Sequence, residues 1–240
     1  DARARLMVLS EMAGEWETTV QGWFVRNGAT DTAGPDRVDE IMLYQTLVGA
    51  WPLEPFANGT ARQHFRDRIL GWQTKALREA KRHTGWIDPD VAYEDACAAF
   101  ATRLLDPAIS GDFLHQMESL VARIAPAGAL NGLSQTLLRL TTPGVPDLYQ
   151  GCDLWDFSLV DPDNRTPPDF LHRAALLEQS TRFSAAAATW RTGRVKQDLI
   201  RRILSFRQQY PDLFARGTYE PVTLNGPDRD HAIAFIRRHG

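Results

Sequence analysis

Apolar residues recur with a helical period through the first 140 residues of this chain, and the pattern stops at the segment Thr141-Thr-Pro-Gly-Val-Pro146. Trp16, Val20 and Trp23, for example, fall on one stripe of a 3.6-residue period. Two prolines and a glycine prevent a helix from continuing beyond residue 141. The pattern predicts a mainly α fold, with helices that start near Trp16, Val38, Asn58, Asp88, Asp112 and Leu130.

The chain changes character after residue 146. Residues 147–150, Asp-Leu-Tyr-Gln, are predicted to form a short buried strand, and residues 151–170 form a loop rich in proline and aspartate. After Pro211 the hydrophobic period shifts towards two, which indicates strands. The elements expected in this part are helices over 171–190 and 195–209 and strands over 219–224 and 232–236.

The composition is that of a soluble globular protein, because 43% of the 240 residues are hydrophobic and 24% are charged. The length is sufficient for one large domain or two modest ones. The formal net charge of −3 lacks the basic excess that nucleic-acid binding requires. No apolar run approaches the roughly 18 residues of a membrane span. We therefore expect neither a nucleic acid nor a membrane as a partner.

Cysteine usage indicates a reducing compartment. Cys97 and Cys152 are too few for a disulfide framework, and the N-terminal segment lacks a signal-peptide core, so we expect reduced thiols and a cytoplasmic location. Neither cysteine has a second cysteine or a histidine at ligand spacing, and no phosphate-loop or dinucleotide fingerprint is present. No metal and no cofactor is expected. Because the helical pattern starts at once and the last predicted strand runs close to residue 240, we expect a piece of a longer protein.

Charge is unevenly distributed along the chain. Residues 61–83 carry seven basic side chains and two acidic ones, whereas residues 147–169 carry six aspartates and one arginine. Within the basic segment, Lys75, Arg78 and Arg82 share a helix face, which is usually solvated. The two segments are thus either a solvated helix face and a polar loop, or two surfaces that face each other across a polar cleft.

Two clusters combine polar and aromatic residues. The first contains Tyr149-Gln150-Gly151, Trp155 and the run Asp161-Pro-Asp-Asn-Arg165, which suits a hydroxyl-rich ligand such as a sugar. The same Asp-Pro-Asp-Asn run is also good turn chemistry. The second runs from Lys75 to Trp86, where the cations also fit a simple role at a helix C-terminus. His83 by itself is more typical of a structural or surface residue.

Several long blocks of the sequence match one known family. The longest are residues 142–151, Thr-Pro-Gly-Val-Pro-Asp-Leu-Tyr-Gln-Gly, and residues 158–165, Ser-Leu-Val-Asp-Pro-Asp-Asn-Arg. Further blocks lie at 43–52, at 75–81 with Thr84 and Trp86, and at 214–219, so that the resemblance covers practically the entire chain. In these blocks the chain resembles the maltooligosyltrehalose synthase family of the α-amylase superfamily. Asp153, where that family commonly has glutamate, is a small departure.

The resemblance implies the C-terminal portion of a (β/α)8 (TIM) barrel enzyme. Residues 1–130 would be a helical insertion after the seventh barrel strand, and residues 131–210 would contain the last barrel strand, Val145–Gln150, and the closing helices. Residues 211–240 would be the first strands of a C-terminal β-domain. Barrel active sites lie at the C-terminal ends of the strands, which would place Tyr149 and Gln150 beside the substrate.

The resemblance also implies a reaction. The family converts the reducing-end α-1,4 bond of a maltooligosaccharide, an α-1,4-glucan, into an α,α-1,1 bond, an isomerase step of trehalose biosynthesis. Retention of configuration requires two carboxyl groups about 5–5.5 Å apart. In the family all three catalytic carboxylates precede the region matched here, so no residue of this chain is expected to be catalytic. The chain alone is then expected to be inactive and to need the N-terminal remainder of the same enzyme.

On this hypothesis the chain shapes the substrate pocket. The alternative is a non-catalytic helical module that binds α-glucan or only packs against other protein, and the two blocks at 142–151 and 158–165 together disfavour a plain α-glucan hydrolase. The residues expected to contact sugar or to shape the pocket are Lys75, Lys81, Trp86, Tyr149, Gln150, Asp161, Asp163, Asn164 and Arg165.

Overall fold

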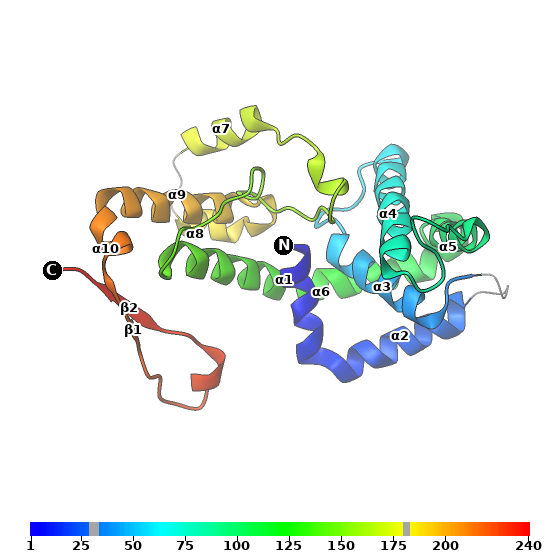
Figure 1. Cartoon of the computed structure of the whole chain (residues 1–240), viewed down its shortest axis with the longest axis horizontal. Helices are drawn as coiled ribbons and strands as arrows, with labels where there is room; N and C mark the ends of the chain where they lie inside the picture. The colour runs from blue at the N-terminus through cyan, green and yellow to red at the C-terminus, as the bar shows by residue number, and fades with distance from the viewer. Residues whose placement is uncertain (29–33, 180–182) are drawn as a thin grey trace. The chain divides into compact units, whose positions relative to one another are not determined.

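A computed structural model describes residues 1–28, 34–179 and 183–240 of the chain. The chain is mainly helical, as the periodicity predicts, and its elements can be followed in Figure 1. It divides into two compact units. The first unit comprises Asp1–Asn131 and Asp156–Pro167, and the second comprises Gly132–Trp155 and Pro168–Gly240.

Side-chain caps begin three helices of the first unit, because an aspartate or asparagine oxygen accepts backbone N–H groups that the first helical turn leaves free. The caps are Asp36, Asn58 and Asp90. The helices of this unit are α1 (Ala2–Leu6), α2 (Ala13–Asn27), α3 (Arg37–Ala50), α4 (Gly59–Ala80), α5 (Val91–Leu104) and the first part of α6 (Pro107–Thr141), and a 3-10 helix, Met7–Met12, follows α1.

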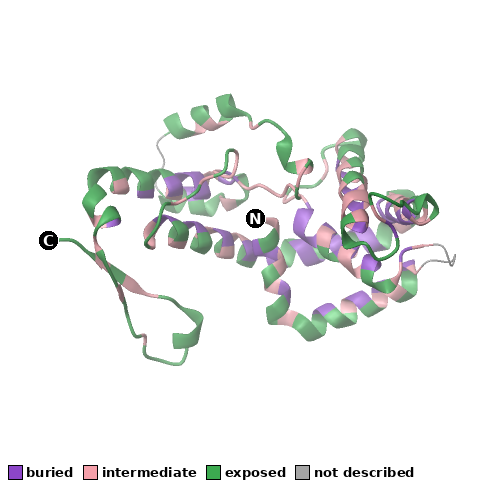
Figure 2. Ribbon diagram, in the orientation of Figure 1, coloured by how far each residue is buried: buried purple, intermediate pink, exposed green. Residues whose placement is uncertain are grey.

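The core of the first unit contains a cluster of aromatic rings among aliphatic side chains. The Trp23 ring lies 5.1 Å from the Tyr44 ring and 5.0 Å from the Phe113 ring, measured between centroids. The Trp23 indole N–H donates to Oε1 of Gln116 at 2.9 Å, so the buried ring leaves no unpaired donor. Figure 2 shows buried residues along α3 and α6, and the predicted inward stripe of α2 is confirmed.

Arg5 joins α1 to the end of α3. The residue is 1% exposed, and its Nη1 donates to the carbonyl oxygens of Val48, Gly49 and Trp51 at 3.1, 3.3 and 2.6 Å. A helix C-terminus leaves such carbonyls free and favours a cation. The guanidinium also lies 3.9 Å from the centroid of the Phe157 ring. Burial lowers the pKa of Arg5 to about 10.

The second unit packs short helices around α9 (Arg194–Gln209), which was predicted over 195–209. Its small core contains Leu140, Ile200 and Ile203. The predicted strands form an antiparallel hairpin in which Thr218 lies opposite Arg238. The other elements of this unit are the end of α6, α7 (Phe170–Glu178), α8 (Phe183–Ala188), α10 (Pro211–Ala215), β1 (Thr218–Pro221) and β2 (Phe235–Arg238).

Several helix boundaries differ from the predictions. α5 is capped by Asp90 and not by Asp88, because the Asp90 side chain accepts from the Tyr93 N–H while its own N–H donates to the Thr84 hydroxyl. α6 has a non-helical backbone at Ser110, so its long part begins close to the predicted start at Asp112. The separate helix predicted to start near Leu130 is a continuation of that part, which passes through Pro126. Residues 171–190 form α7 and α8, and residues 180–182 of that predicted helix lie outside the described residues.

The strand predicted over residues 147–150 is absent, and Tyr149 and Gln150 are exposed. An extended segment becomes a strand when a neighbouring strand takes up its N–H and C=O groups. In the described part of the chain, the hairpin of β1 and β2 is the whole of the sheet, so this segment has no partner strand there. Among the described residues, no helix has the length and apolar character needed to cross a bilayer.

Candidate functional site

The nine predicted substrate-binding residues fall in both units. Tyr149 and Gln150 belong to the second unit, and the other seven belong to the first. Within the first unit, the basic helix α4 and the acidic segment 156–165 lie against each other, and a 3-10 helix, Asp163–Arg165, packs on α4. The contact is direct, because ion pairs join the two surfaces.

Asp163 is the main link between the acidic segment and α4. Its two carboxylate oxygens accept from Nε and Nη2 of Arg68 at 2.7 and 2.9 Å, and Oδ2 also accepts from the Leu159 N–H at 2.6 Å. Nη2 of Arg68 also donates to the Phe157 carbonyl at 3.2 Å. Burial alone would raise the pKa of Asp163, but the hydrogen bonds from Arg68 and Leu159 hold it below its usual value. Asp163 therefore shapes the loop.

Asp161 contacts α4 through Lys75, which follows Arg68 by seven residues on the helix. Nζ of Lys75 donates to its carbonyl oxygen at 2.5 Å, and Arg165 pairs with its carboxylate. Asn164 is exposed, and the Arg165 side chain is 72% exposed. An amide, a carboxylate and a guanidinium at one edge supply the donors and acceptors that vicinal hydroxyls require. The structure thus brings Lys75, Asp161 and Arg165 together, with Asp163 and Asn164 in the same 3-10 helix as Arg165.

Lys81 and Trp86 lie on the turn that follows α4. Lys81 ends the helix in the left-handed conformation, with φ of 54°. Thr84 is buried, whereas 57% of Trp86 is exposed. Arg78 and Arg82, whose helix face was read as solvated, are engaged in ion pairs with Glu94 and Asp39. This turn is therefore held in place and presents an aromatic ring to solvent.

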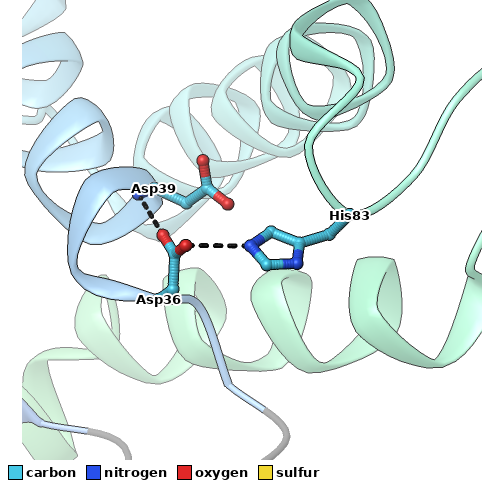
Figure 3. Close-up of side chains that lie close together, drawn as sticks. All are labelled: Asp36, Asp39 and His83. Atoms are coloured by element: carbon cyan, nitrogen blue, oxygen red, sulfur yellow. Dashed lines mark hydrogen bonds and ion pairs between the residues drawn. The ribbon is translucent and has the colours of Figure 1, made fainter.

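A cluster of potential metal ligands lies beside the same turn. Figure 3 shows Asp36, Asp39 and His83, whose possible ligand atoms all lie within 4.8 Å of one another. Arg82 pairs with the carboxylates of both Asp36 and Asp39. Burial alone would raise the pKa of Asp36, but hydrogen bonds from Arg82 and His83 hold it well below its usual value. Since Arg82 already supplies the positive charge, the cluster is better suited to anchor the turn than to bind a metal.

Tyr149 and Gln150 line a pocket of about 390 Å³ in the second unit. Small-molecule sites are on the order of 300–1,000 Å³. The lining is mainly apolar and includes Leu148, Phe170 and Ile200. Such a lining suits the face of a ring or an apolar side chain better than a charged group.

A polar network that the sequence analysis did not identify fixes the chain after Gln150. The Asp153 carboxylate accepts from Nε of Arg173 at 2.9 Å and from Nε2 of Gln197 at 3.0 Å. Arg173 also donates to the Gly151 carbonyl at 3.0 Å, and buried Lys196 donates to the Leu154 carbonyl at 3.3 Å. The partners are about 20 to 45 residues apart in the sequence, so local spacing gives no signal for them. The one sequence feature that drew attention to this network was Asp153, which stands where the resembled family commonly has glutamate.

No protein-family model matches the chain. Over 239 residues, 99% of its length, the chain is 35% identical to a Mycobacterium tuberculosis (strain H37Rv) protein that carries the name maltooligosyl trehalose synthase. The protein of strain CDC 1551 gives the same values. The match covers 28% of each, so the chain spans less than a third of the length of these curated relatives.

Solved structures agree with the sequence matches. A crystal structure of a maltooligosyl trehalose synthase has a TM-score of 0.82 and 30% identity to this chain, over 99% of this chain and 31% of the other. The maltooligosyltrehalose synthase from Arthrobacter ramosus gives a TM-score of 0.78 and 36% identity, over 99% and 28%. The resemblance predicted from the sequence blocks is confirmed: over practically its whole length, this chain is similar to a portion of the maltooligosyltrehalose synthases.

Proposed function

We propose that this chain is part of an intramolecular transglycosylase, an isomerase of trehalose biosynthesis that converts the reducing-end α-1,4 bond of a maltooligosaccharide into an α,α-1,1 bond. The observation that carries the proposal is the 35% identity over 99% of the chain to a protein named for that synthase. The part of this chain in the reaction is to shape the substrate pocket, and it acts in the cytoplasm without a cofactor.

The loop 156–165 supports a pocket-shaping role. A transglycosylase must keep water away while the released sugar is held, because hydrolysis otherwise competes. Arg68 and Lys75 fix the loop on α4, and this leaves Asn164 and Arg165 exposed at its edge. A rigid edge of hydrogen-bonding groups can hold a sugar in one orientation with little loss of conformational entropy.

Residues 145–150 support the barrel assignment. Val145 is 98% exposed and Tyr149 is 55% exposed, and an apolar pocket lies beside Tyr149. Both features suit a segment that pairs with a strand of the preceding polypeptide, which would also supply the catalytic carboxylates. The assignments of 1–130 to a helical insertion, 131–210 to the end of the barrel and 211–240 to a β-domain belong to the same proposal.

A non-catalytic glucan-binding module is the second candidate. In its favour, the carboxylates of Asp163 and Glu94 are held in ion pairs with arginines, which makes them poorly suited to act as catalytic acids. Burial raises the pKa of Glu40, as a general acid requires, but Glu40 is 2% exposed and accepts from the Tyr44 hydroxyl, so substrate cannot reach it. This chain alone is expected to be inactive, and its incubation with maltohexaose checks that expectation. Formation of any trehalosyl product would contradict it.

A chimeric enzyme tests the main proposal. The matching segment of the Arthrobacter ramosus synthase is replaced by residues 1–240, and formation of trehalosyl product and of glucose from maltohexaose is measured. We expect trehalosyl product. A chimera that folds, as judged by circular dichroism and melting temperature, but forms no such product refutes the proposal.

The same chimera tests the role of Arg165. Arg165→Ala is expected to lower the ratio of trehalosyl product to glucose, because the exposed guanidinium would no longer hold the sugar. Arg26→Ala, an exposed arginine on α2, serves as the matched control. An unchanged product ratio removes Arg165 from the pocket.

A further inference from the structure

Trp86 is an exposed tryptophan on a turn that is anchored on both sides. The Thr84 hydroxyl donates to Oε1 of Glu94 at 2.6 Å and accepts from the Asp90 N–H at 2.9 Å. His83, on the same turn, bonds to Asp36 at 2.8 Å. Between these anchors the chain presents Trp86 and Ile87 to solvent, 57% and 101% exposed. Tryptophan is enriched at binding surfaces because its large rigid ring buries much area at low entropic cost.

Arg78 connects the anchor to the indole ring. Its Nε and Nη2 donate to the two Glu94 oxygens, both at 2.7 Å, and this bidentate pair fixes the plane of the guanidinium. The Glu94 side chain is 9% exposed, which makes it a firm support. Cζ of Arg78 lies 5.0 Å from the centroid of the Trp86 ring, within the roughly 6 Å range of cation–π contacts. Arg78 thus braces a ring that remains more than half in solvent.

We propose that Arg78 is a positioning residue that holds Trp86 as a stacking platform for a glucose ring of an α-1,4-glucan. The choice of ligand rests on the proposed function. A ring that is already braced loses little conformational freedom when the C–H face of a sugar stacks on it. Lysine cannot replace Arg78, because an ammonium lacks both the planar fork for Glu94 and the flat surface for the indole.

Fluorine NMR of the whole chain tests the inference. The seven tryptophans are labelled as 5-fluorotryptophan, and the Trp86 resonance is assigned by its absence in Trp86→Phe. We expect maltohexaose to shift this resonance and Arg78→Lys to raise the dissociation constant about fivefold. Arg66→Lys is the matched control, because Arg66 lies on the same helix and pairs with its neighbour Asp67. The other six resonances report whether each variant keeps its fold.

Two results overturn the inference. One is a Trp86 resonance that does not respond to maltohexaose, and the other is an Arg78→Lys variant that binds as tightly as the unaltered chain. Failure here is distinguishable from failure of the proposed function. An active chimera with an unresponsive Trp86 refutes only the platform, whereas a responsive Trp86 in an inactive, folded chimera refutes only the transglycosylase assignment.

Discussion

The pair between Arg68 and Asp163 is the contact that decides where the candidate loop lies. Arg68→Met keeps the apolar stem on α4 but removes two hydrogen bonds to Asp163 and one to the Phe157 carbonyl. After this substitution, the Leu159 N–H still donates a hydrogen bond to the Asp163 carboxylate, but the two hydrogen bonds from Arg68 are lost. We expect the loop 156–165 to open more often, since a poorly solvated carboxylate is left without its cation.

The size of the effect follows from the exposure of the two side chains. Exposed ion pairs contribute about 0–1 kcal/mol, whereas breaking a fully buried pair costs about 3–5 kcal/mol. Here the Asp163 side chain is 9% exposed and that of Arg68 is 37% exposed, so solvent screens one partner. We expect a loss of about 2 kcal/mol in the free energy of loop opening, between those limits.

Hydrogen exchange at the Leu159 amide measures this opening directly, because that N–H is bonded to Asp163. A loss of about 2 kcal/mol lowers its protection roughly 30-fold. Arg66→Met on the same helix is the control, and its pair with Asp67 has an N–O distance of 3.9 Å. Equal exchange rates at Leu159 in the two variants would refute the reasoning.

Three further predictions concern single substitutions. The pKa of Asp163 is lowered in the folded chain, so its contribution is complete above the unfolded value of about 3.9 and is lost as pH falls through the folded value. Asp163→Asn should therefore be less stable than the unaltered chain at pH 7, and the difference should shrink as the pH falls below the unfolded value; a urea-denaturation difference that does not change with pH contradicts this. Gln73 is 2% exposed, and its amide atoms have no partner among the described residues, so Gln73→Leu should raise the free energy of unfolding by about 1–3 kcal/mol. A less stable variant would count against it. Gly128→Ala should lower the melting temperature, because the added Cβ would lie 2.8 Å from Cα of Arg5. This clash opposes the higher helix propensity of alanine. An unchanged melting temperature would show that α1 can shift to accommodate the methyl group.

Local pattern was sufficient for most of the helices. The stripe of Trp16, Val20 and Trp23 is buried as predicted, and α9 and the final hairpin lie close to the expected positions. These features depend on periodicity, caps and turn residues, and each of these signals is encoded by residues close together in the sequence. The polar loop 161–165 was likewise recognisable, as was the likeness to the synthase family.

The tertiary structure decided the contacts between distant residues. Arg68 and Asp163 are 95 residues apart, and no local rule distinguishes Arg68 from the other arginines of α4. The same is true of Arg78, which the helical spacing placed on a solvated face and the fold pairs with Glu94. Residues 147–150 were predicted to form a strand that the structure does not contain. A strand forms only where a neighbouring strand takes up its hydrogen bonds, and the local sequence does not show whether such a partner is present. Periodicity therefore determined which segments are helical, whereas long-range pairing of charges and backbone groups decided which side chains the candidate site holds in place.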